Sequence, residues 1–155
     1  MEKREIKMIT YKDTLKELTY KLCQYEIQLY TARYEQGGWL SENKMNKYFQ
    51  STPEKMAFSR LMYLARSANQ LYSPSDIADA LHISRTAVHN IINETIPAGW
   101  VVQCCSEGNR KFYRASDVLA EAMEETASWT HDAWFSIGLS DTDWLLSVIK
   151  EREKV

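Results

Sequence analysis

The spacing of apolar residues near the start of the chain predicts a long helix. The first apolar line recurs at alternating steps of three and four residues, as one face of an α-helix requires, and comprises Met8, Tyr11, Leu15, Leu18, Leu22, Tyr25, Leu29 and Ala32. A second apolar line beside it comprises Tyr20, Cys23, Ile27, Tyr30 and Tyr34. A helix this broadly apolar needs partners on two sides, so it either pairs with a second copy of the chain or packs entirely within its own monomer.

A second helix is expected after a short connector. The glycines at positions 37 and 38 end the first helix, and residues 39–50 have the pattern of a short amphipathic connector. Ser51 stands three residues before Glu54, and Pro53 lies in the first turn, which is a capping-box pattern. The many apolar residues that follow predict that this helix is the central and most buried one.

Two more helices are expected at the end of the chain. Ser116 and Asp117 cap one helix, which Gly138 interrupts, and the polar residues 140–143 cap a final short helix. We divide the chain into an N-terminal helix with connector at 1–50, a central domain at 51–116 and C-terminal helices at 117–155. Because the sequence contains no low-complexity linker, these three parts are expected to form one continuous structural unit.

The central segment has the pattern of two short helices that cross at an angle. A turn and helix start at residues 73–76 lead into the first helix, and Ser84 is the expected N-cap of the second. Ala78 allows a close crossing because its side chain is small. The residues expected to fill the angle between the helices are Leu81, Ile83, Val88 and Ile91.

A β-hairpin is expected directly after the second of these helices. Its parts are a turn at 97–99, a strand at 100–105, a charged turn at 106–110 and a second strand at 111–114. Because side chains alternate across a strand, Cys104 and Cys105 are expected on opposite faces, one toward the core and one toward solvent. Two crossed helices and a hairpin define a winged helix-turn-helix, so we predict a mainly α fold with a small β-hairpin, flanked by N- and C-terminal dimerisation helices.

One known family shares this pattern at the level of residues. The run Ile77-Ala78-Asp79-Ala80-Leu81-His82-Ile83-Ser84-Arg85-Thr86-Ala87-Val88, followed by Ala98-Gly99-Trp100-Val101, resembles the multiple-antibiotic-resistance regulator (MarR) family. The resemblance implies a homodimeric transcriptional regulator, with a repressor favoured, that binds a pseudo-palindromic operator. Two positions depart from the family pattern: His82 stands where Gly is frequent, and Gly108 stands where the wing has an acidic residue.

The outward side chains of the second helix and the hairpin are the candidate DNA contacts. Arg85 and Asn90 are the predicted base readers, because Arg can bind guanine and Asn can bind adenine through paired hydrogen bonds in the major groove. Arg110 is placed to enter the minor groove. The complete predicted set is Ser73, Ser75, Ser84, Arg85, Thr86, His89, Asn90, Asn93, Asn109, Arg110, Lys111 and Arg114. The alternative is that these residues form an ordinary solvated face.

The resemblance also raises the question of an effector. Several aromatic residues, including Trp134, recur at helical spacing. Such residues either line a cavity for a small molecule or form part of the hydrophobic core. Cys23 stands among tyrosines, as in the organic-hydroperoxide regulators of the same family, so it is either an oxidant sensor or a small buried hydrophobe. The candidate ligand or redox site comprises Tyr20, Cys23, Tyr30, Tyr34 and Trp129.

Charge separates the central segment from the rest of the chain. The whole chain has a net charge of −2 and a pI near 5.9. Between residues 82 and 114 four cationic side chains stand against Glu94 and Glu107, which gives 4 − 2 = +2. Any attraction to nucleic acid must therefore be local.

Composition and motifs argue against several other classes of protein. The three cysteines suggest neither a disulfide framework nor a zinc knuckle, and the start of the chain predicts neither a signal peptide nor a membrane span, so we expect a cytoplasmic protein. The three histidines have no metal spacing, and we expect neither an enzyme nor a cofactor. The alternatives left open are a winged-helix module for protein interaction or assembly, and a plasmid or phage DNA-binding protein that does not act at promoters.

Overall fold

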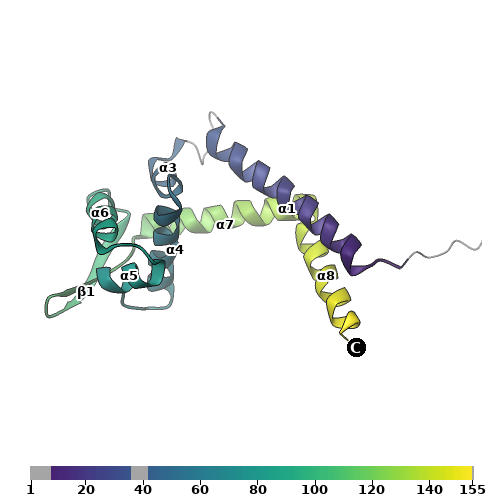
Figure 1. Cartoon of the computed structure of the whole chain (residues 1–155). Helices are drawn as coiled ribbons and strands as arrows, with labels where there is room; N and C mark the ends of the chain where they lie inside the picture. Colours follow the sequence, from purple (N-terminus) through teal and green to yellow (C-terminus); the bar gives the residue numbers. More distant parts are fainter. Residues whose placement is uncertain (1–7, 36–41, 155) are drawn as a thin grey trace, which may run out of the picture. The chain divides into compact units, whose positions relative to one another are not determined.

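A computed structural model of the chain describes residues 8–35 and 42–154 and is mainly helical, with a small two-stranded antiparallel hairpin (Figure 1). In chain order the elements are α1 (Tyr11–Tyr34), α3 (Lys44–Gln50), α4 (Pro53–Ser67), α5 (Pro74–Leu81), α6 (Arg85–Thr95), β1 (Val101–Glu107), β2 (Arg110–Ala115), α7 (Asp117–Ile137) and α8 (Leu139–Glu153). The expectation of a mainly α fold with a β-hairpin is confirmed. Within the described ranges, no helix is both long and apolar enough to cross a membrane.

The chain divides into two compact units, with boundaries after Ala32 and after Ala127. One unit contains α1 as far as Ala32, the last part of α7 and α8. The other contains α3 to α6, both strands and the first part of α7. The long helix α7 therefore contributes residues to both units.

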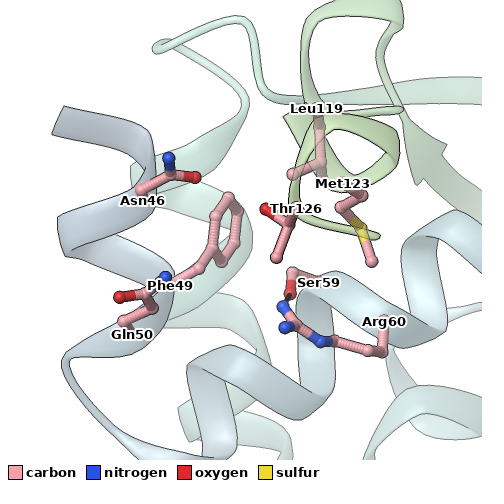
Figure 2. Close-up of a pocket in the computed structure, with 8 residues that line it drawn as sticks. All are labelled: Asn46, Phe49, Gln50, Ser59, Arg60, Leu119, Met123 and Thr126. Carbon is pink, nitrogen blue, oxygen red and sulfur yellow. Dashed lines mark hydrogen bonds between the residues drawn. The ribbon is translucent and has the colours of Figure 1, made fainter. Parts of the chain in front are cut away.

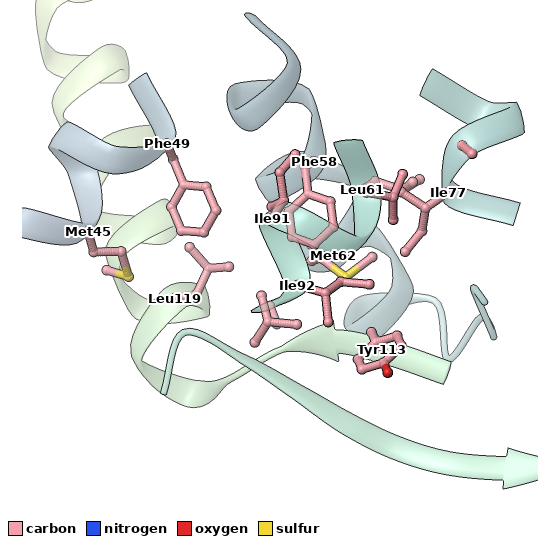
Figure 3. Close-up of a cluster of buried hydrophobic side chains, with 14 of the residues drawn as sticks. Met45, Phe49, Phe58, Leu61, Met62, Ile77, Ile91, Ile92, Tyr113 and Leu119 are labelled. Carbon is pink, nitrogen blue, oxygen red and sulfur yellow. The ribbon is translucent and has the colours of Figure 1, made fainter. Parts of the chain in front are cut away.

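The core of the second unit is built around α4. Phe58 and Met62 are completely buried, and five residues of α4 are buried in all, more than in any other described helix. Figure 3 shows apolar side chains from α3, α4, α5, α6, β2 and α7 meeting around them. The prediction that this helix is the most buried one is confirmed.

The start of α4 lies one residue later than the sequence pattern suggested. Thr52 is the N-cap: its backbone is extended, and its hydroxyl oxygen accepts a hydrogen bond from the Lys55 amide at 3.2 Å. Ser51 instead ends α3 in a helical conformation and donates its hydroxyl to the Tyr48 carbonyl. The predicted capping role of Ser51 is therefore wrong, because its backbone belongs to the preceding helix.

Helices α5 and α6 begin where the sequence predicted. Ser73 caps α5 in a reciprocal capping box with Asp76, and the Ser84 hydroxyl oxygen accepts from the Ala87 amide at 3.0 Å. Between them, His82 ends α5 in a left-handed conformation with φ of 54°. A side chain with a Cβ is strained there, which explains why glycine suits this position.

The hairpin is longer than predicted and contains a β-bulge. Its strands pair from Val101 opposite Ala115 to Glu107 opposite Arg110, and they are joined by a two-residue loop. The register shifts between Gln103 and Cys105, so Cys104 has no partner residue in β2. The two cysteine sulfur atoms lie only 3.4 Å apart. The prediction that Cys104 and Cys105 face opposite sides is wrong, because the bulge breaks the alternation of side chains.

The first unit is held together by polar contacts at the turn between α7 and α8. Lys21 of α1 donates to the Gly138 carbonyl at 3.2 Å and to the Thr142 hydroxyl at 2.7 Å. Gly138 has a φ of 66° and ends α7 as predicted, but α8 begins immediately at Leu139. The predicted cap at residues 140–143 is wrong: these residues lie inside the first turn of α8, which has no side-chain cap.

Several large apolar side chains of α1 are exposed in a single chain. Of its described side chains only Thr14 is buried. Ile27 and Tyr30 are more than 60% exposed, and Leu15 and Leu22 are each 40% exposed. In one copy of the chain the described side chains of the second apolar line are therefore left exposed, whereas most of the first line is half-buried.

Candidate nucleic-acid interface

Helix α6 separates its polar and apolar residues onto two faces. Its inward face carries the buried residues Val88, Ile91, Ile92 and Thr95, and the Thr95 hydroxyl donates to the Ile91 carbonyl. The residues predicted to contact DNA, which are Ser84, Arg85, Thr86, His89, Asn90 and Asn93, are all exposed. The structure thus brings these six onto one exposed surface, which we call the α6 face.

The α6 face carries no acidic side chain before its end. The first acid is Glu94, whose carboxylate lies 3.9 Å from the Lys55 ammonium. Lys55 also lies 4.3 Å from the centre of the Tyr48 ring, where the negative ring face attracts its charge. Burial raises the pKa of the Tyr48 phenol, and the nearby Glu94 carboxylate raises it further. The positive charge of Lys55 therefore offsets part of the negative charge that Glu94 places at the end of the α6 face.

Two open grooves flank α6. One has a volume of about 490 Å³ between the start of α4 and α6, and Ser84 and Asn90 line it beside Lys55. The other, of about 470 Å³, lies between the end of α6 and the hairpin, where Asn93 and Lys111 share the lining. Each groove is thus lined by two of the residues predicted to contact DNA.

The guanidinium group of Arg110 lies against the start of α5. It donates to the Asp76 carboxylate at 3.2 Å and to the Ser73 hydroxyl at 3.5 Å, and it lies 5.4 Å from the centre of the Phe112 ring. Asp76 also accepts hydrogen bonds from the Ser73 amide and hydroxyl. These bonds from Ser73, and after them the charge of Arg110, lower the pKa of Asp76. Asp76 of α5 is therefore the acidic partner of Arg110, a pairing that the sequence did not reveal.

Ser73 is not placed for the phosphate contact that was predicted for it. Its side chain is buried and its hydroxyl is used in the α5 cap, so it is not available for a phosphate contact. Ser75 is half-buried in the first turn of α5. On the hairpin, Asn109 and Lys111 are exposed, whereas Arg114 is half-buried opposite Val102. Of the predicted set, Ser73 is the residue we remove.

The candidate ligand or redox residues Tyr20, Cys23 and Tyr30 of α1 and Trp129 of α7 lie in the other unit. Tyr20, Cys23 and Tyr30 are exposed, so the interpretation of Cys23 as a buried hydrophobe is wrong. Trp129 lies 6.4 Å from Tyr25, measured between ring centres. Tyr25 also contacts Trp134 at 5.7 Å, edge to face, and its central place in this cluster was not predicted. The Tyr34 side chain lies outside the described residues.

A small cavity in the second unit is lined by polar and apolar side chains from α3, α4 and α7 (Figure 2). Its lining consists of Asn46, Phe49, Gln50, Ser59, Arg60, Leu119, Met123 and Thr126. The volume of about 40 Å³ suits water rather than an organic effector, whose pockets usually exceed about 300 Å³. Over residues 8–35 and 42–154, no group of three His, Cys, Asp or Glu side chains is placed to hold a metal ion.

Comparison of the chain with protein-family models, with curated proteins and with solved structures finds no match.

Proposed function

We propose that α5, α6 and the hairpin form a winged helix-turn-helix, and that the chain is a MarR-like transcriptional regulator that binds double-stranded DNA as a homodimer. The observation that carries the proposal is the α6 face: six adjacent hydrogen-bonding side chains are exposed without an acid among them, while the opposite side of the helix is buried. A solvated face of ordinary composition would also include acidic residues, in a chain with 21 of them.

In this proposal α6 enters the major groove. Arg85 and Asn90 contact base edges, and each paired hydrogen bond to the correct base contributes about 1–3 kcal/mol of discrimination. Ser84 and Thr86 stand at the start of the helix, where free amides and hydroxyls suit a phosphate. In this arrangement Arg85 and Asn90 read the bases, and Ser84 and Thr86 contact the phosphates.

The hairpin acts as the wing. Arg110 exchanges the Asp76 carboxylate for the negative potential of a narrow minor groove. The exchange is inexpensive, because the side chain of Arg110 is 58% exposed and an exposed ion pair contributes only about 0.2–1 kcal/mol. Lys111 remains on the exposed side of the hairpin for a flanking phosphate.

A second copy of the chain is the partner proposed for the first unit. Large apolar side chains are exposed along α1, and Trp144 and Val148 of α8 are 67% and 44% exposed. Apolar surface gathered in this way marks an interaction site. A twofold dimer would present two α6 faces to a pseudo-palindrome, with half-site centres about 34 Å apart.

The test is selection of bound duplexes from a random library, followed by fluorescence anisotropy on the selected duplex. We expect selected duplexes with twofold symmetry, a twofold protein dimer by light scattering, and a steep fall in affinity with salt. Arg85→Ala and Asn90→Ala should each weaken binding at least fivefold, whereas Lys47→Ala, which removes an exposed charge of α3, should not. Absence of binding at low salt would favour the protein-interaction module, and equal affinities for all variants would reject the α6 face.

A further inference from the structure

The bulge in β1 creates a pair of thiols that the proposed DNA-binding function does not use. In a regular strand two successive side chains point to opposite faces. Here Cys104 is the extra residue of the bulge, and its sulfur lies 3.4 Å from the sulfur of Cys105. Cys105 is exposed and Cys104 is half-buried, with its sulfur 3.7 Å from the Phe112 carbonyl oxygen. Two accessible thiols therefore converge on one side of the hairpin.

A direct bond between these sulfurs is disfavoured by the backbone. The Cα atoms of adjacent residues lie about 3.8 Å apart across a trans peptide, whereas disulfides usually join Cα atoms about 4.4–6.8 Å apart. A disulfide here would be strained and easily reduced. The pair is consequently better suited to holding an atom between its sulfurs than to bonding within itself.

The distance between the sulfurs selects the kind of atom. With bonds of about 2.3 Å, as in zinc–thiolate bonds, sulfurs 3.4 Å apart subtend an angle of about 95° at the bridging atom. A linear two-coordinate ion with such bonds would need sulfurs about 4.6 Å apart. A pyramidal centre with a lone pair, such as trivalent arsenic, has bond angles near this calculated angle. The geometry therefore favours a pyramidal thiophilic centre over a linear one.

We propose that Cys104 and Cys105 form a chelating site for trivalent arsenic compounds. With a monosubstituted arsenical, written R–As=O, both S–H bonds and the arsenic–oxygen bond break and two arsenic–sulfur bonds form. The two protons leave with the oxygen as one water molecule. Arsenic remains trivalent, so no oxidant or reductant is needed.

The charges around the pair are consistent with stepwise reaction. The hydrogen bond with Cys104 raises the pKa of the Cys105 thiol, and Arg114 opposes this shift weakly. The raised pKa favours the protonated form of Cys105, and a thiolate is the nucleophile for the first arsenic–sulfur bond. The second thiol then lies close enough to close the ring without movement of the strand.

The test uses phenylarsine oxide with the full chain, which is first reduced with a phosphine that contains no thiol. The phosphine is then removed by gel filtration, because it would itself reduce the disulfide used to count thiols. Free thiols are counted with a chromogenic disulfide before and after one equivalent of the arsenical, and the melting temperature is recorded. We expect the wild-type count to fall from three, the number of cysteines in the chain, to one. Cys23→Ser is the matched control that should still lose two thiols, whereas Cys104→Ser and Cys105→Ser should keep both of theirs.

The melting temperature distinguishes a site built by the fold from two thiols that merely react. A ligand that binds the folded hairpin better than the unfolded chain raises the melting temperature, so we expect a rise for wild type and Cys23→Ser alone. Modification with an unchanged or lower melting temperature would overturn the proposal. Equal thiol loss in Cys104→Ser or Cys105→Ser, or air oxidation of this pair to a disulfide in place of arsenical binding, would overturn it too. None of these outcomes depends on whether the chain binds DNA.

Discussion

Replacing Asp76 with Asn changes the contact that holds Arg110 against the start of α5. In the wild type the same carboxylate oxygen accepts from the Ser73 amide at 2.9 Å, from the Ser73 hydroxyl at 2.8 Å and from Arg110 at 3.2 Å. The Asn side chain retains a neutral acceptor of nearly the same shape. The substitution therefore removes the charge and leaves most of the geometry in place.

The expected loss of stability is modest. An exposed ion pair contributes about 0.2–1 kcal/mol, and the side chain of Asp76 is 37% exposed. Charge-assisted hydrogen bonds are roughly twice as strong as neutral ones, so the cap loses about 0.5 kcal/mol more. The sum is about 1 kcal/mol, which lowers the melting temperature of a domain of this size by about 3 °C. Urea titration of Asp76→Asn beside Asp79→Asn, which removes an exposed charge from the same helix, measures the difference.

The pH dependence has a definite sign. The pKa of Asp76 in the folded protein lies below its ordinary value of 3.8, so the folded state favours the ionised carboxylate. The contribution is fully present above pH 3.8 and is lost as the pH falls through the lowered value. Stability of the wild type and of Asp76→Asn should therefore converge in acid, and the carboxylate of Asp76 is the group whose titration causes this convergence.

The same variant tests the proposed role of Arg110 in DNA binding. Without the carboxylate, Arg110 no longer leaves an ion pair when it enters the groove, so affinity for the selected duplex should rise about two- to fivefold. The rise should vanish in the Arg110→Ala background. A double-mutant cycle with additive effects on both stability and affinity would refute the reasoning, because it would mean that the two side chains are not coupled.

Three further predictions concern stability and are each measured by urea or thermal unfolding with circular dichroism. His82→Gly should be more stable than His82→Ala by about 1 kcal/mol, since only the alanine retains a Cβ at a φ of 54°; equal stabilities would contradict a left-handed backbone there. Lys21→Met should lose about 1–2 kcal/mol through its contacts with Gly138 and Thr142, whereas the exposed Lys16→Met should lose little. Met62→Ala should lose about 2–5 kcal/mol because the side chain is completely buried, and a loss below 1 kcal/mol would mean that this core is not packed around α4.

Helix starts show how far short-range patterns can be trusted. Residues 73–76 were correctly predicted as a helix start and Ser84 as a cap, because a cap depends on hydrogen bonds to amides two or three residues away. The start of α4 was misplaced by one residue, because Ser51 and Thr52 are both good caps. The choice between them depended on where α3 ends, and that is set by the packing of Met45 and Phe49 in the core.

The sequence alone determined the mainly helical fold, the hairpin and the separation of α6 into a buried and an exposed face, because each depends on periodic spacing within a few residues. Only the tertiary structure decided three features. It paired Arg110 with Asp76, 34 residues away, and Lys21 with Thr142, 121 residues away. It also brought the sulfurs of Cys104 and Cys105 together through a bulge in strand pairing. Such contacts depend on how distant segments are packed, and no local pattern of residues encodes that packing.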